Sequence, residues 1–172
     1  MISSLQIQDL RLSFDANDKN VTLFDGLKAE FKAGELTAIV GPSGVGKSTL
    51  LRVISGFQCP HRGSVRLRLA ERDAGASREI QKGECGFVFQ DFGLVPRMTA
   101  LETVCSGALG RLHWLRGLLG VYPHAVQKRA ESILEEWGLK GKEDSRVDTA
   151  QLSGGEKQRA AIGRTLMQEA TM

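Results

Sequence analysis

Apolar and polar residues alternate along much of the N-terminal part of the chain. Residues 5–14 (LQIQDLRLSF) and 63–70 (GSVRLRLA) place many apolar side chains at every second position, a period typical of strands with one buried face. Residues 27–40 continue in this style and are interrupted by Ala33 and Gly34. The pattern predicts strands over residues 5–14 and 63–70, and two more strands around a turn at Ala33 and Gly34.

Two short segments are apolar at almost every position. Residues 36–40 (LTAIV) and 86–90 (GFVFQ) have the composition of strands that are buried on both faces. We therefore expect two buried strands there. Residues 71–84 are polar and irregular, which predicts a surface loop.

The second half of the chain changes to helical spacing. Residues 99–109, 124–137 and 154–168 are expected to be helices, and residues 139–150 a polar connection. The middle helix has one apolar stripe, formed by Val126, Ala130, Ile133, Leu134 and Trp137. Strands first and helices later indicate an α/β core that carries a helical insertion.

Composition narrows the class of protein. The chain has 172 residues, 41% hydrophobic and 25% charged, which are ordinary values for a globular domain and make disorder and coiled coil poor interpretations. A net charge of +3 without a dense basic stripe is no nucleic-acid footprint, although it is compatible with small anionic ligands. No segment approaches the length of a membrane span, and the N-terminus lacks a signal-peptide pattern. Any connection to a membrane is therefore expected to go through a partner.

Residues 41–49 (GPSGVGKST) fit the phosphate-loop pattern GxxxxGK[ST]. Glycines let backbone N–H groups approach phosphate oxygens, and the helix expected to begin near Lys47 points its positive end at the same anion. Lys47 can reach the β- and γ-phosphates, and the Ser48 hydroxyl can bind Mg²⁺. The candidate nucleotide-binding residues are Gly41, Pro42, Ser43, Gly44, Val45, Gly46, Lys47, Ser48 and Thr49.

The alternative is a glycine-rich turn with no ligand. A buried strand before the loop and a helix after it favour the nucleotide interpretation. The loop alone does not distinguish kinases, GTPases and transport ATPases.

Residues 152–156 (LSGGE) resemble the signature motif of ATP-binding cassette (ABC) proteins. The resemblance implies that Leu152, Ser153, Gly154, Gly155 and Glu156 contact the ATP held by the phosphate loop of a second subunit, in a head-to-tail dimer. A hydroxyl and open N–H groups at a helix N-terminus suit an anion. Ser153 is also a good N-cap, and both roles are compatible.

The family also implies roles for two residues outside these motifs. Phe14 stands where the family stacks an aromatic ring on adenine, and Gln90 stands where a glutamine touches Mg²⁺ and the attacking water. Without the resemblance, Phe14 could equally be a core aromatic and Gln90 a surface residue. The implied cofactors are ATP and Mg²⁺, with Ser48 and Gln90 at the metal.

The fold implied is α/β: a P-loop NTPase core with an N-terminal antiparallel β-subdomain and an inserted α-helical subdomain, incomplete at the C-terminus. The resemblance implies that residues 1–172 form one partial nucleotide-binding domain. Within it, about residues 1–90 hold the β-subdomain and P-loop core, and about residues 91–172 hold the Q-loop, helical subdomain and signature helix.

The family continues after the signature helix with a strand ending in Asp, a catalytic Glu and a switch His. His61, His113 and His124 all precede the signature, so no residue present matches these catalytic groups. We expect a partial copy of an ABC-type ATPase, not competent for hydrolysis alone and weakened by an open sheet edge. A purposeful short variant is the alternative.

Residues 107–123 and 166–170 resemble the ATP-binding subunits of phosphonate importers. Within the first segment, Trp114, Leu115, Leu118 and Leu119 are expected to be buried in a helix pair. Glu156, Gly163 and Thr165 depart from the common signature-helix pattern and weaken the choice of substrate.

The resemblance implies the ATP-binding subunit of a bacterial ABC importer, of the phosphonate type, held at the cytoplasmic face of the plasma membrane by permease subunits. The alternatives are another importer, a lipoprotein-release system, a soluble ABC protein of repair or translation, and a non-functional gene remnant.

Overall fold

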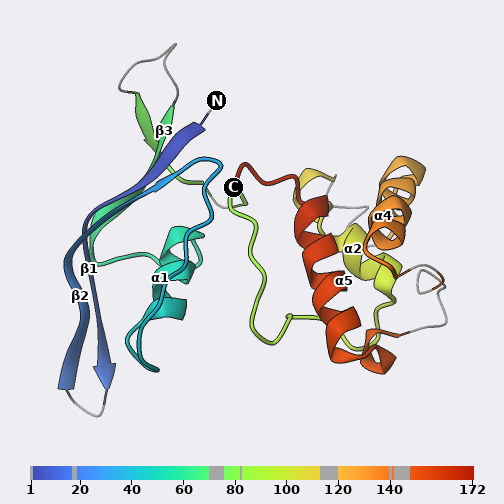
Figure 1. Cartoon of the computed structure of the whole chain (residues 1–172), viewed down its shortest axis with the longest axis horizontal. Coiled ribbons are helices and arrows are strands. Elements are labelled where there is room, and N and C mark those ends of the chain that lie inside the picture. The colour runs from blue at the N-terminus through green and yellow to red at the C-terminus, as the bar shows by residue number, and fades with distance from the viewer. Residues whose placement is uncertain are drawn as a thin grey trace. The chain divides into compact units, whose positions relative to one another are not determined.

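The computed structural model describes residues 2–16, 19–69, 76–81, 83–112, 120–139, 141 and 148–172. The chain divides into two compact units, Met1–Cys85 and Gly86–Met172, here called the N-terminal unit and the C-terminal unit. Among the described residues, the first unit contains the β-sheet and one helix, and the second is helical (Figure 1).

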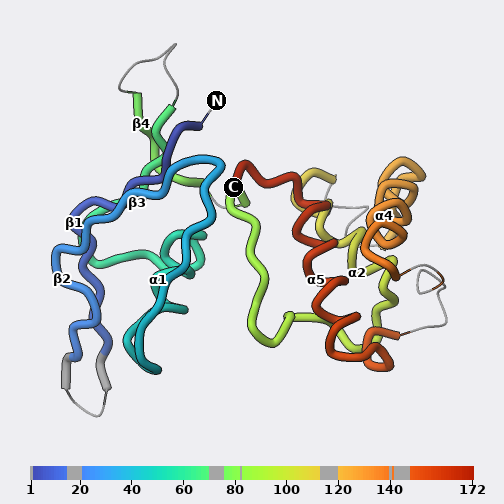
Figure 2. Tube along the Cα trace, in the orientation of Figure 1, coloured from blue at the N-terminus to red at the C-terminus, as the bar shows by residue number. Residues whose placement is uncertain are grey.

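An antiparallel sheet forms the N-terminal unit. Its order is β2-β1-β3-β4, and every neighbouring pair runs antiparallel. The trace in Figure 2 shows β1 and β2 as a long curved hairpin. The strands are β1 (Ile2–Ala16), β2 (Lys19–Lys32), β3 (Arg62–Leu69) and β4 (Ser77–Glu79). The predicted strand over residues 5–14 and the turn at Ala33 and Gly34 are confirmed, and the strand predicted over residues 63–70 is confirmed up to Leu69, because residue 70 lies outside the described residues.

The apolar positions of this sheet pack on helix α1 (Lys47–Ile54). The buried core of the unit consists of Leu5, Ile7, Leu10, Leu12, Val65 and Leu67 from the strands and Leu50, Val53 and Ile54 from α1. The period of two therefore points one face of β1 and β3 at the helix. This packing fixes the helix that begins at the phosphate loop.

The two predicted buried strands are wrong. Residues 36–40 form no strand, and the side chains of Leu36 and Val40 are 101% and 87% exposed. Residues 86–90 are also irregular, and the Gly86 N–H donates to the Met172 carbonyl at 2.6 Å. A strand needs a partner for its N–H and C=O groups, and within the described ranges no strand pairs with either segment. Apolar composition alone did not make a strand.

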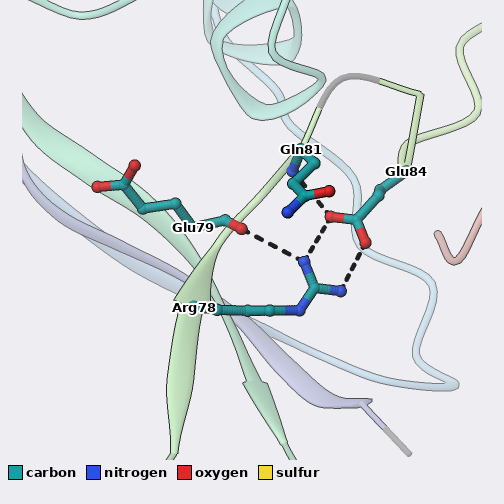
Figure 3. A network of polar contacts seen from close by, with 4 residues as sticks. All are labelled: Arg78, Glu79, Gln81 and Glu84. Atoms are coloured by element: carbon teal, nitrogen blue, oxygen red, sulfur yellow. Dashed lines mark hydrogen bonds and ion pairs between the residues drawn. The ribbon is translucent and has the colours of Figure 1, made fainter.

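The predicted loop over residues 71–84 is wrong in part, because it contains β4. Residues 71–75 and 82 lie outside the described residues. Arg66 holds β4 by donating to the Ser77 hydroxyl and carbonyl, both at 3.0 Å. After the strand, Arg78 donates to both carboxylate oxygens of Glu84, at 2.6 and 2.5 Å, and Glu84 also accepts from the Gln81 N–H at 2.8 Å (Figure 3). These contacts hold the pKa of Glu84 below its usual value, with Arg78 as the largest cause.

Three of the described helices pack together in the C-terminal unit, and they confirm the predicted helices with shifts of a few residues at the ends. The core combines α2, α4 and α5 and includes Ala130, Ile133 and Leu134 of the predicted stripe, with Val126 and Trp137 packed against them. The elements are α2 (Ala100–Ser106), η2 (Leu109–Arg111), α4 (His124–Glu136), η3 (Thr149–Gln151) and α5 (Gly154–Met167).

Gly163 lets helix α5 approach its neighbours. A Cβ at this position would lie 3.1 Å from side-chain atoms of both Ile133 and Val104. The departure from Ala that the sequence shows at residue 163 therefore has a packing reason. The predicted burial of Trp114, Leu115, Leu118 and Leu119 falls outside the described residues. Among the helices described, none is long and apolar enough to cross a bilayer.

Candidate functional site

Residues 41–49 connect the exposed segment 36–40 to helix α1, which begins at Lys47 as predicted. Gly46 is the N-cap of α1 and has φ 102°, in the left-handed region that favours glycine. A Cβ there would also lie 2.8 Å from the Leu23 side chain and 3.0 Å from Phe24. The second glycine of the motif is therefore required both by backbone conformation and by the close approach of β2.

A hollow of about 300 Å³ opens at this loop. It is lined by Phe14, Leu23, Gly44, Gly46, Lys47, Ser48 and Thr49. The structure thus brings Phe14, from β1, to the same hollow as Lys47 and Ser48. The Phe14 side chain is 41% exposed, so it is not a core aromatic. An aromatic ring, an ammonium group and two hydroxyls around one hollow are the groups needed to hold a base and its phosphates.

The electrostatics of the loop suit an anion. The Lys47 Nζ donates to the carbonyls of Gly41 and Pro42, at 2.9 and 2.8 Å, which keeps the ammonium folded over the loop. No acidic residue lies in the first turn of α1, and the positive end of the helix dipole adds to the Lys47 charge. None of the residues described as lining the hollow is acidic. The loop therefore fits a phosphate group, and the hydroxyls of Ser48 and Thr49 fit a hydrated Mg²⁺ at its edge.

Gln90 belongs to the C-terminal unit and is exposed. It lies inside a turn closed by the Phe92 N–H, which donates to the Phe89 carbonyl at 3.0 Å. Its expected contact with Mg²⁺ stays a prediction.

The signature residues surround the start of α5. Leu152 is buried in the helical core, and Ser153 is the N-cap. The Ser153 N–H donates to Glu156 Oε2 at 2.9 Å, and the Glu156 N–H donates to the Ser153 hydroxyl at 3.4 Å, which makes a capping box. The N-cap role of Ser153 is confirmed. Gly154 and Gly155 are exposed, and a Cβ on either would meet nothing within 4 Å.

Two residues that contact these loops were missed by sequence reasoning. Leu23 forms a wall of the hollow, and Arg164 donates to the carbonyls of Phe92 and Gly93. Leu23 belongs to the alternating pattern of β2, which was a usable signal. No sequence signal pointed to Arg164, because its partners are backbone carbonyls about 70 residues away along the chain.

Comparison with known proteins identifies the class. The sequence profile of the ABC transporter family matches residues 24–172, and the chain belongs to this family. Solved structures agree. A dimeric bacterial ABC transporter cassette, MJ0796, matches with a TM-score of 0.70 and 27% identity over 96% of this chain and 70% of that one. A nucleotide-free ATP-binding cassette matches with a TM-score of 0.74 and 25% identity over 99% of this chain and 66% of that one. The predicted cassette fold is confirmed.

Curated relatives carry a more particular description. The phosphonates import ATP-binding protein PhnC of Maricaulis maris is 37% identical over 97% of this chain and 63% of its own length. PhnC 1 of Natronomonas pharaonis is 43% identical over 84% of this chain and 58% of its own length. The predicted likeness to phosphonate importers is confirmed. The chain spans about 60% of the length of the relatives that it matches.

Proposed function

We propose that the chain binds ATP with Mg²⁺ at residues 41–49 and serves as the ATP-binding subunit of a phosphonate importer. The observation that carries the proposal is the shared hollow of Phe14, Lys47 and Ser48. Phe14 stacks on the base, Lys47 exchanges two carbonyls for phosphate oxygens, and Ser48 binds Mg²⁺ together with Gln90. The names of the relatives support phosphonate as the substrate class.

The proposed partners are a second ATP-binding subunit and membrane permease subunits, which hold the chain at the inner face of the plasma membrane. ATP hydrolysis is the reaction that the family implies. In the proposed dimer, the signature residues 152–156 contact the ATP of the other subunit. Two exposed glycines support this role, because Gly154 and Gly155 weaken the first turn of α5 without serving any packing within the described fold. A close approach from outside the chain accounts for them.

A competition titration tests the nucleotide site. ATP, AMP and tripolyphosphate are each titrated with Mg²⁺ against a fluorescent ATP analogue bound to the full chain. ATP and tripolyphosphate should displace the analogue, whereas AMP, which lacks the β- and γ-phosphates, should not. Phe14→Ala should weaken the affinity for ATP about tenfold, because stacking on a base contributes roughly 1–3 kcal/mol. The affinity for tripolyphosphate, which has no base, should stay unchanged. Displacement by AMP as strong as by ATP would overturn the proposal.

A further inference from the structure

Arg164 extends from helix α5 to the loop that follows Gln90. Its Nη1 donates to the Gly93 carbonyl at 2.7 Å, and its Nη2 donates to the Phe92 carbonyl at 3.0 Å. The side chain is half-buried, and burial lowers its pKa. One guanidinium thus holds two consecutive carbonyls, a geometry that the planar fork of Arg makes specific.

The backbone that Arg164 holds is strained. The strain lies at Phe92, which has φ 62°, whereas the following residue at φ 54° is Gly93, which adopts this region freely. The left-handed region is unusual for an aromatic residue and persists only where the surroundings enforce it. Phe92 also closes the turn around Gln90 through its N–H. Arg164 therefore fixes the conformation of the turn on which Gln90 stands.

The far end of the same loop is tied to the segment that precedes the signature. The Thr149 hydroxyl donates to the Val95 carbonyl at 2.7 Å, and the Thr149 N–H donates to the Met98 carbonyl at 2.8 Å. Thr149 is buried and lies four residues before Ser153. Residues 92–98 are thus anchored at one end to the last turn of α5, through Arg164, and at the other to the chain just before α5.

We infer that Arg164 is a positioning residue: it locks the turn that carries Gln90 onto the signature helix, with Thr149 as the second anchor. Gln90 and Ser153 then belong to one rigid body. A displacement of Gln90 therefore moves the signature helix, and a displacement of the signature helix moves Gln90. The inference rests on the proposed function, because it takes Gln90 to contact Mg²⁺. It assigns to Arg164 an effect on Mg²⁺-dependent nucleotide binding, which a residue that only stabilises the fold would not have.

The test measures ATP affinity of the full chain with Mg²⁺ and with EDTA, for wild type, Arg164→Lys and Arg111→Lys. Arg111 is the matched control, because it also contacts the end of α5, through the Met167 carbonyl and Glu169, and these two partners do not belong to the Gln90 turn. Arg164→Lys should reduce the gain in affinity from Mg²⁺ by about threefold to tenfold, since an ammonium replaces a two-donor fork. Arg111→Lys should leave the gain unchanged. If both variants lost the Mg²⁺-dependent gain in affinity equally, Arg164 would only stabilise the fold, and the inference would be overturned.

A double-mutant cycle with Gln90→Ala sharpens the result. If Arg164 acts through Gln90, Arg164→Lys has no further effect on the Mg²⁺ gain in the Gln90→Ala background. A full additional loss there would overturn the inference.

Amide exchange separates this inference from the proposed function. A wild type that binds no ATP, or gains nothing from Mg²⁺, overturns the proposed function and the predicted link to Mg²⁺. Arg164→Lys should still speed hydrogen exchange of the Phe92 amide at least tenfold relative to Arg111→Lys, because the turn loses its lock. Unchanged exchange would show that Arg164 does not hold the turn at all.

Discussion

In the C-terminal unit, α2, α4 and α5 bury their apolar stripes on one another, whereas in the N-terminal unit the apolar residues Leu36 and Val40 stand exposed although the sheet and α1 are well packed. A helix satisfies its backbone hydrogen bonds locally and needs neighbours only for its apolar face. A strand needs a neighbour for both. Apolar residues therefore pack into a core where they lie on the helices, whereas residues 36–40, with which none of the described strands pairs, stay exposed.

Two leucines give the largest expected contrast between the units. Leu134→Ala should lower the free energy of unfolding by about 2–5 kcal/mol, because Leu134 is fully buried among the helices. Leu36→Ala should change it by less than about 0.5 kcal/mol, because Leu36 is fully exposed. Urea unfolding followed by circular dichroism measures both. A comparable loss in Leu36→Ala would show that residues 36–40 are packed in solution.

Substitutions at two glycines test whether, in each unit, a glycine is required because a backbone carbonyl lies close to it. Gly107→Ala should destabilise the C-terminal unit by about 1–3 kcal/mol, because the new Cβ would lie 2.0 Å from the Arg164 carbonyl oxygen. Gly63→Ala should act similarly in the N-terminal unit, where the new Cβ would lie 2.4 Å from the Asp9 carbonyl oxygen. Gly110→Ala is the control, with nothing within 4 Å. Thermal melts that rank Gly110→Ala with the other two would contradict these close approaches.

Two capping boxes in the C-terminal unit separate stability from function. Ser153 caps α5 with Glu156, and Thr99 caps α2 with Glu102. Replacing either cap by Ala should cost about 0.5–2 kcal/mol of stability. In a mixed dimer with an intact copy, only Ser153→Ala should weaken the ATP held by the partner. Equal nucleotide effects of the two variants would remove the signature from the proposed dimer site.

The smallest expected effect is the loss of stability at acid pH that Glu84 causes in the N-terminal unit. Because its folded-state pKa is lowered from 4.5 by Arg78, its contribution to stability is present above about pH 4.5 and is lost as the pH falls through the lower folded value. Glu84→Gln should therefore be slightly less stable than wild type at pH 7, and the difference should shrink as the pH falls below about 4.5. Melting temperatures across this range measure the difference. A gap that stays constant with pH would show that the carboxylate charge is not its source.

Local signals explain what could be predicted. The helices over residues 124–137 and 154–168 follow from a period that needs no distant information. The phosphate loop was found because its chemistry needs particular residue types at fixed spacing. The predicted strands at residues 36–40 and 86–90 were wrong because strand formation depends on a partner that composition does not reveal. The role of Arg164 was missed because its hydrogen-bond partners are backbone carbonyls, which every residue carries.

The central claim is that residues 41–49 hold the phosphates of ATP, and one titration tests it directly. Mg²⁺ and a fluorescent ATP analogue are titrated into the full chain as wild type, Lys47→Ala and Lys28→Ala. Lys28 is an exposed lysine of β2 in the same unit, so its removal changes the net charge equally. Lys47→Ala should weaken binding about 10- to 100-fold, since a charged hydrogen bond contributes roughly 1.5–3 kcal/mol, and Lys28→Ala should match wild type. Equal affinity of wild type and Lys47→Ala would contradict the claim.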